Sequence, residues 1–325
     1  GDNNFFGCYA GAYNTTGGDN NFLGNKAGQY NTTGNSNNFL GDCAGYCNTE
    51  GEYNNFFGSF AGRYNTTGGY NNFIGHQGGY SNTTGCYNNF FGNLAGYYNT
   101  TGCSNNFIGN NAGYQNTTGC YNNFIGHYGG YNNTTGCSNN FFGTYAGYSN
   151  TTGSRNNFLG RDAGCDQTTG NNNVAIGYSV QLPNTTGSNQ LVIGVGASAW
   201  INGDSSFNIG IGTTNPTSKL HVIGEVTAID YNSTSDARLK NNIQIIDDPL
   251  EKVLQINGVS FNWIKDNRPS LGVIADNIQE ILPELVSDTD PKTVNYNGLI
   301  GLLIEVVKEQ QAQIESLNER LTKLE

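Results

Sequence analysis

The stretch GDNNFFGCYAGAYNTTG, residues 1–17, is the first of a series of 17-residue units that makes up most of the chain. Ten regular units run without insertion to Gly170, and two degenerate units follow over 171–187 and 188–204. Because a unit this short cannot fold alone, its repetition predicts a solenoid in which each unit stacks on the next. Within a unit we expect a strand, a glycine bend, a short second strand and an Asn-Thr-Thr-Gly turn. The sequence therefore predicts a mostly β fold, a parallel β-roll or β-solenoid, over residues 1–204.

Composition narrows the class of protein. Of 325 residues, 14 are basic, 25 are acidic and 47 are glycine, and the formal net charge is −11. The absence of a basic run argues against nucleic acid as a partner. The longest apolar stretch is far shorter than the ~20 residues of a membrane span, so we expect no membrane insertion. The chain also lacks methionine, so we expect a further N-terminal part to precede it.

Two adjacent apolar columns predict that the repeats associate with other chains. Position 5 of the unit is Phe in all ten regular units, and position 6 is Phe, Leu or Ile. Successive side chains of a strand point to opposite faces. One column would then fill the coil, and the other would form an outward apolar stripe that another chain is expected to bury. A wider coil that holds both columns inside is the alternative.

Residues 1–204 show no pattern that predicts catalysis or metal binding. Glu50 and Glu52 are close in sequence, but no pair of carboxylates stands out as a glycosidase would need. His76 and His127 lie three coils apart, too far to share a metal, and are expected at the surface. One repeat column holds cysteines, for which a ladder of free thiols is favoured over disulfides: Cys86, Cys103, Cys120 and Cys137. We expect no metal and no cofactor.

The Asn of the Asn-Thr-Thr-Gly turn has two interpretations. The tripeptide is an acceptor for N-glycosylation. The stronger interpretation is structural, because Asn and Gly supply the turn and stacked Asn side chains form hydrogen-bonded ladders.

Two segments resemble known families. The units NNNVAIG and SNQLVIG, at 171–177 and 188–194, resemble the head repeats of trimeric autotransporter adhesins, which form a left-handed parallel β-roll. The segment YNSTSDARLKNNI, residues 231–243, resembles the start of the endosialidase-type intramolecular chaperone, a self-cleaving Ser–Lys peptidase domain. That resemblance extends over 235–325, and it leaves 205–234 as a connector that ends at the cleavage site.

The chaperone resemblance implies specific site residues. Its motif Ser-Asp-x-Arg-x-Lys is present as Ser235, Asp236, Arg238 and Lys240. It implies cleavage between Thr234 and Ser235, with Ser235 as the nucleophile and Lys240 as its base; Asp236 and Arg238 support the motif. A lysine amine can be that base if burial lowers its pKa. Residues five apart on a helix point to different sides, so either the segment bends or the lysine of a neighbouring chain serves.

The C-terminal segment 299–325 is a predicted coiled coil. Its residues follow a 3,4 spacing over more than three heptads, with one polar layer at Gln310. We call this set the seam: Ile300, Leu303, Val307, Gln310, Ile314, Leu317, Leu321 and Leu324. A single amphipathic helix that packs on its own domain is the alternative.

Together these features predict a homotrimeric fibre or adhesin. Its C-terminal chaperone would drive trimerisation and solenoid folding and would then release itself by autoproteolysis, with no external substrate. Such a protein is expected on a virion, as a fibre or surface appendage, or otherwise outside the cell or at its surface. Besides copies of itself, a host-cell receptor or glycan would be its partner. The alternative is a tailspike with glycan-degrading activity in a missing N-terminal region.

Overall fold

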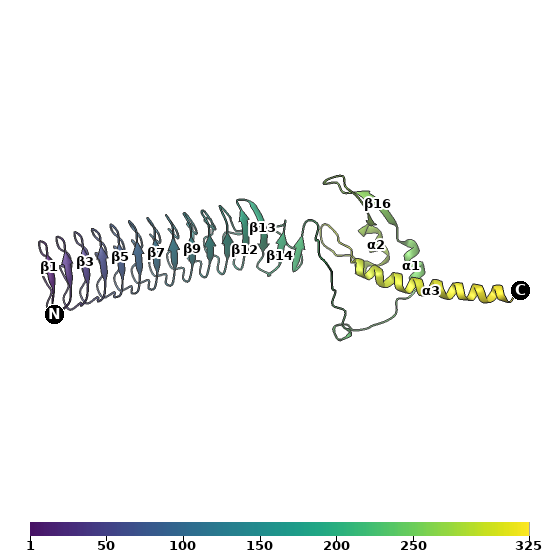
Figure 1. The fold of residues 1–325 in the computed structure, drawn as a ribbon, viewed down its shortest axis with the longest axis horizontal. Coiled ribbons are helices and arrows are strands. Elements are labelled where there is room, and N and C mark those ends of the chain that lie inside the picture. Colours follow the sequence, from purple (N-terminus) through teal and green to yellow (C-terminus); the bar gives the residue numbers. More distant parts are fainter. Residues whose placement is uncertain (325) are drawn as a thin grey trace. The chain divides into compact units, whose positions relative to one another are not determined.

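The computed structural model describes residues 1–324, which form two compact units, Gly1–Thr227 and a second unit that begins at Ala228. In the first unit, three-residue strands recur every 17 residues, and each pairs in parallel with its neighbours (Figure 1). Equivalent residues are in register, as in Phe90 opposite Phe107. The strands are β1 (Asn4–Phe6), β2 (Asn21–Leu23), β3 (Asn38–Leu40), β4 (Asn55–Phe57), β5 (Asn72–Ile74), β6 (Asn89–Phe91), β7 (Asn106–Ile108), β8 (Asn123–Ile125), β9 (Asn140–Phe142), β10 (Asn157–Leu159), β11 (Val174–Ile176) and the longer β12 (Leu191–Val195). The predicted parallel β-solenoid of 17-residue units is confirmed.

The expected second strand of each unit is wrong. Positions 8 to 13 form turns, because position 9 adopts a left-handed backbone conformation, as at Asn111 (φ 56°). In the ten regular units position 11 is also left-handed and is always glycine. A Cβ at Gly113 (φ 59°) would lie 2.5 Å from the ring of Phe107. The chain therefore curls back over the phenylalanine instead of extending along a second sheet.

The position 5 column forms the core of the solenoid. From Phe22 to Phe158 these rings are fully buried and stack on one another, with centroids 4.7–4.9 Å apart and nearly parallel planes. Position 6 points outward, and Leu40, Ile108 and Leu159 are 39–40% exposed. The prediction of one inner and one outer column is confirmed, and the wider coil with both columns inside is wrong.

Asparagine ladders join the coils on both sides of this core. At position 4, Asn21 donates from Nδ2 to Oδ1 of Asn38 in the following coil (2.8 Å). At position 14 the direction reverses, since Asn31 Nδ2 donates to Asn14 Oδ1 in the preceding coil (2.7 Å) and to Gly34 O (3.0 Å). Position 14 is fully buried in units 2 to 9. The folded coils therefore do not offer these amides for glycosylation, and the ladder interpretation is the correct one.

Replacing Asn116 by Ala is expected to open the ladder at one coil. Asn116 donates to Asn99 Oδ1 (2.8 Å) and Gly119 O (3.0 Å) and accepts from Asn133 (2.8 Å). The variant leaves these buried groups without partners, at a cost of about 1–3 kcal/mol each before relaxation. Hydrogen exchange should show a loss of amide protection in the coils around the substitution. The exposed Asn110→Ala is the control, and equal exchange in both variants would contradict the ladder's role.

The first compact unit, Gly1–Thr227, ends with a change in how its strands pair. After β12 the chain turns back, and β13 (Ser198–Gly203) pairs antiparallel with β12, with a shift of register after Ile193. Strand β14 (Ile209–Ile211) pairs antiparallel with β13 and parallel with β15 (Leu220–Val222). The coil geometry therefore stops within the last unit of the repeat.

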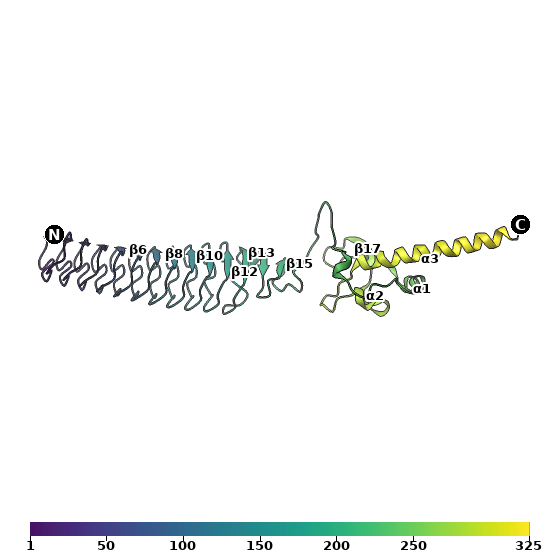
Figure 2. The ribbon, with the colours of Figure 1, turned by 90° about the horizontal axis from the view of Figure 1, so that it is seen from below.

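The second unit is a small α and β domain (Figure 2). Its hairpin joins β16 (Gly258–Asn262) to β17 (Pro269–Val273). The helices are η1 (Ala237–Leu239), α1 (Pro249–Gln255), α2 (Ala275–Ile281), η2 (Pro283–Leu285) and the long α3 (Tyr296–Thr322). The core gathers α1, α2 and one face of α3 around Ile278, Leu282, Leu302 and Val306. Within residues 1–324, no helix combines the length and the apolar character that crossing a membrane requires.

Candidate functional site

A tight turn shapes the segment that carries the Ser-Asp-x-Arg-x-Lys motif. Asp236 caps the 3₁₀ helix η1, because its Oδ1 accepts the backbone N–H of Arg238 (2.9 Å) and its Oδ2 accepts Arg238 Nη2 (2.7 Å). The hydrogen bonds of the Arg238 side chain lower the pKa of the Asp236 carboxyl, and the same contacts raise the pKa of Arg238. Backbone bonds from Leu239 to Asp236 O and from Lys240 to Ala237 O, both 3.1 Å, close the turn. Asp236 and Arg238, the two residues of the motif to which no catalytic role was assigned, therefore fix the backbone of the motif in this turn.

This turn brings Ser235 and Lys240 together. Lys240 is extended (φ −126°, ψ 148°) at the end of η1. Its Nζ lies 2.7 Å from Ser235 Oγ and donates to it. The segment therefore bends enough for the lysine of the same chain to reach the serine.

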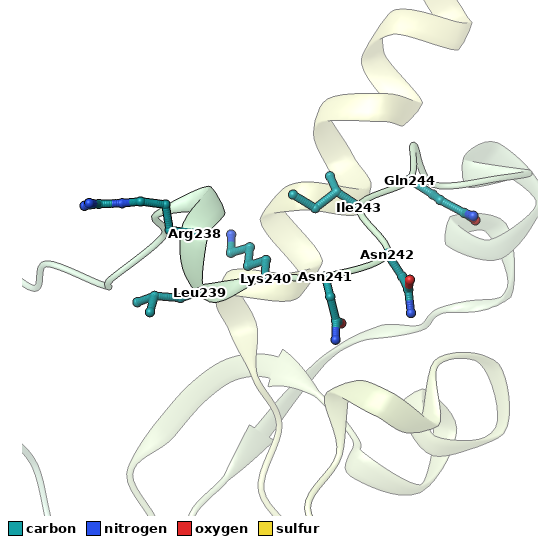
Figure 3. A pocket seen from close by; sticks show the side chains of 7 residues that line it. All are labelled: Arg238, Leu239, Lys240, Asn241, Asn242, Ile243 and Gln244. Atoms are coloured by element: carbon teal, nitrogen blue, oxygen red, sulfur yellow. The ribbon is translucent and has the colours of Figure 1, made fainter.

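Both side chains are exposed in the isolated chain. Figure 3 shows Lys240 in an open depression lined by Arg238, Leu239, Lys240, Asn241, Asn242, Ile243 and Gln244. As a donor the amine only orients the serine oxygen. To take the serine proton, the Lys240 amine must be neutral.

Asn297, a residue outside every motif noted in the sequence, ties the residues before Ser235 to helix α3. Its Nδ2 donates to Ser233 Oγ (3.0 Å), and its backbone N–H is capped by Asn295 Oδ1 (3.1 Å). The contact spans 64 residues, so no local pattern marks it. It places the predicted cleavage site next to the first turn of α3.

Helix α3 has two apolar faces. Leu302 and Val306 are 2% and 5% exposed and pack in the core of their own domain. The apolar residues of the seam within α3 lie on another face and are 49–63% exposed: Ile300, Leu303, Val307, Ile314, Leu317 and Leu321. The last seam residue, Leu324, follows the end of the helix at Thr322, and Glu325 lies outside the described residues. The helix thus packs on its own domain without using the seam.

The outer face of the solenoid strands carries a shallow groove. It is lined by alternating amide and apolar side chains of positions 4 and 6: Asn89, Phe91, Asn106, Ile108, Asn123, Ile125 and Phe142. The amides are satisfied by one another along the ladder. The face is therefore apolar without unpaired polar groups, which suits burial against a protein surface.

The histidines and cysteines show no site chemistry. His76 and His127 are exposed, as expected. The four column cysteines are free, and each sulfur accepts a backbone N–H from the preceding coil, as from Cys103 to Cys120 (3.1 Å). Over residues 1–324, no group of three or more His, Cys, Asp or Glu side chains is arranged to hold a metal ion.

Two of the comparisons with known proteins find similarity, and the family match falls within the second of the two compact units. Residues 235–287 match the family described as chaperone of endosialidase. The long tail fiber protein Gp37 of Enterobacteria phage K3 is 31% identical over 113 residues, which cover 31% of this chain and 9% of that protein. The protein of the same name from Salmonella phage S16 is 27% identical over 114 residues, or 31% of this chain and 15% of that protein. The chain thus spans a small part of the length of these relatives. No solved structure matches it significantly.

The matched range begins at Ser235 and includes the capped turn and Lys240. The family match and the motif noted in the sequence therefore fall on the same segment. The chain carries a domain of the chaperone-of-endosialidase family, over residues 235–287.

Proposed function

We propose that the chain is part of a homotrimeric tail fibre of a phage virion. Residues 235–325 act as an intramolecular chaperone that assembles the trimer and then leaves by cleavage between Thr234 and Ser235. The phage tail-fibre relatives and the family match support the virion location and the chaperone role. A host-cell receptor or glycan is the external partner that such a fibre would bind.

The observation that carries trimerisation is the second apolar face of α3. A helix that only completed its own domain would need one apolar face, and Leu302 and Val306 already supply it. The seam adds a second face with 3,4 spacing, which parallel coiled coils bury between chains. The position 6 stripe adds a second surface of the same kind along the solenoid.

The order of events follows from the cost of pairing long rods. Aligning three solenoids in register pairs equivalent residues of separate chains, and contacts that no short stretch of chain connects form slowly. A C-terminal domain that trimerises first raises the effective concentration of the three chains and holds their ends level. The coils then add one after another toward the N-terminus.

The proposed cleavage uses Ser235 and Lys240. Neutral Lys240 Nζ takes the hydroxyl proton while Ser235 Oγ bonds to the carbonyl carbon of Thr234. The Thr234–Ser235 C–N bond breaks, and the departing amine takes the proton from Lys240. Water then hydrolyses the ester, which leaves a carboxylate on Thr234 and restores the hydroxyl.

Assembly would control this reaction through solvent access. In the isolated chain Ser235 and Lys240 are exposed, so water reaches both side chains. Asn297 links the cleavage segment to the first turn of α3. Packing of three α3 helices would therefore cover the segment and exclude water from the contact between Ser235 and Lys240, so that cleavage follows assembly.

An aspartate pair in the seam is expected to prevent trimerisation. In a Ser235→Ala background, which retains the whole chain, light scattering should give three times the 34.9 kDa chain mass. Ile314→Asp with Leu317→Asp buries charge at two successive layers of the seam and should yield monomers. Asn318→Asp, on the same helix outside the seam, is the matched control and should remain trimeric. A monomeric parent or a trimeric double variant would contradict the proposal.

A further inference from the structure

The turns of the solenoid carry a stack of tyrosine rings, and different groups lie next to its first and its last ring. At position 12, five rings stack in nearly parallel planes with centroids 4.8–5.3 Å apart: Tyr80, Tyr97, Tyr114, Tyr131 and Tyr148. Inside such a stack both faces of each ring are covered by neighbouring rings. Only the first and the last ring keep a face for another group.

An arginine of the same chain occupies the first end. Arg63 takes position 12 between Tyr46 and Tyr80, and its guanidinium carbon lies 5.5 Å and 6.0 Å from their ring centroids. These distances are those of cation–π contacts. Arg161 makes a similar contact with Tyr178, at 5.8 Å. The solenoid thus uses guanidinium groups on tyrosine faces at two places.

The other end of the stack is a pocket. The coil after Tyr148 has Cys165 at position 12, so a small thiol follows the last ring. A second stack, Tyr128 on Tyr145 at 5.2 Å, ends in the same coil, because Asp162 follows at position 9. The terminal rings of the two stacks meet at 62° with centroids 5.6 Å apart. A pocket lies here, and it is lined by Tyr145, Tyr148, Ser149, Asp162, Cys165 and Asp166.

The pocket is negatively charged. Asp162 already pairs with Arg161 (3.2 Å). Asp166 has no cationic partner within ion-pair distance in the part of the chain that the structure describes; it accepts only the Cys165 thiol (3.6 Å). Burial, with a contribution from the Asp166 charge, raises the pKa of Cys165 to about 11, so the thiol remains neutral. The faces of aromatic rings also carry a negative electrostatic potential.

We propose that this pocket binds the guanidinium group of an arginine side chain from a partner protein. The group would lie on the free faces of Tyr145 and Tyr148 and pair with Asp166. It would cap this end of the stack as Arg63 caps the other. The proposal does not depend on the cleavage reaction or on the trimer.

The test uses the full chain and two tripeptides. Gly-Arg-Gly should give saturation-transfer NMR signals on its arginine side chain and bind in about the millimolar range, as expected for one small charged group. Gly-citrulline-Gly has nearly the same shape without the charge and should not bind. Equal signals from both peptides would overturn the proposal.

Two variants locate the site. Asp166→Asn, at an exposed position, should weaken Gly-Arg-Gly binding about threefold to fivefold. Tyr148→Leu should weaken it about threefold through loss of the cation–π contact. Asp19→Asn and Tyr121→Leu make the same changes at exposed positions outside the pocket and should bind like the wild type. Unchanged binding in Asp166→Asn, or equal losses in the control variants, would overturn the assignment.

Discussion

Ser235→Ala and Lys240→Ala chains are expected to remain uncut, whereas the wild type yields fragments 1–234 and 235–325 on a denaturing gel. Removing the nucleophile or its base should slow cleavage by about four orders of magnitude or more. Lys240 Nζ lies 2.7 Å from Ser235 Oγ, so either change removes one half of a contact that already exists. Mass spectrometry of the fragments would place the cut.

Two further variants separate chemistry from structure. Ser260→Ala removes an exposed hydroxyl of β16, away from the cleavage segment, and leaves the nucleophile, so it should still cut. Lys240→Arg keeps a cation that can donate to Ser235, but a guanidinium does not act as a base and the chain should remain intact. Cleavage by Ser235→Ala or by Lys240→Arg would contradict the mechanism.

Phe107→Ala is expected to break the solenoid locally. Phe107 is fully buried and stacks between Phe90 and Phe124 at 4.8 and 4.9 Å. Its loss leaves a cavity at the centre of a coil. For a buried phenylalanine such a cavity typically lowers the free energy of unfolding by about 3–5 kcal/mol. In a stack where each coil contacts only its neighbours, the damage divides the solenoid into two cooperative segments.

Hydrogen exchange would measure this effect. Amides of the coils next to Phe107 should lose protection, while distant coils near Phe22 remain protected. Phe107→Leu keeps most of the apolar volume and should lose less. Tyr121→Ala, which removes a ring that is 65% exposed, is the surface control. Equal exchange in Phe107→Ala and Tyr121→Ala would contradict the role of the phenylalanine column.

The repeat period made the strand columns predictable, but not the turns between them. Alternation along a strand was enough to separate the inner Phe column from the outer stripe. The left-handed residue at position 9 left no such signal, because its identity changes from Tyr9 to Lys26 to Cys43 while its backbone stays the same. That conformation is imposed by stacking on the neighbouring coils, which overrides local preference.

The candidate site shows the same division. The motif identified Ser235 and Lys240, but their spacing alone allowed either a bend in one chain or a lysine from another. The cap that Asp236 provides to η1 brings the two side chains together within one chain. Asn297 was beyond prediction, because its contact with Ser233 depends on how the whole domain folds. The seam, by contrast, could be predicted from the 3,4 spacing of its apolar residues alone.

The opposed asparagine ladders have a consequence for how such proteins change over generations. Each amide bonds to its equivalent 17 residues away, so duplication or deletion of one whole unit by recombination recreates the same bonds across the junction. Every such event would lengthen or shorten the rod by about 4.8 Å. An insertion of any other size would shift the Asn and Phe columns out of line. The length of the solenoid can therefore change in steps of one coil, while the Phe core and the Asn ladders stay the same.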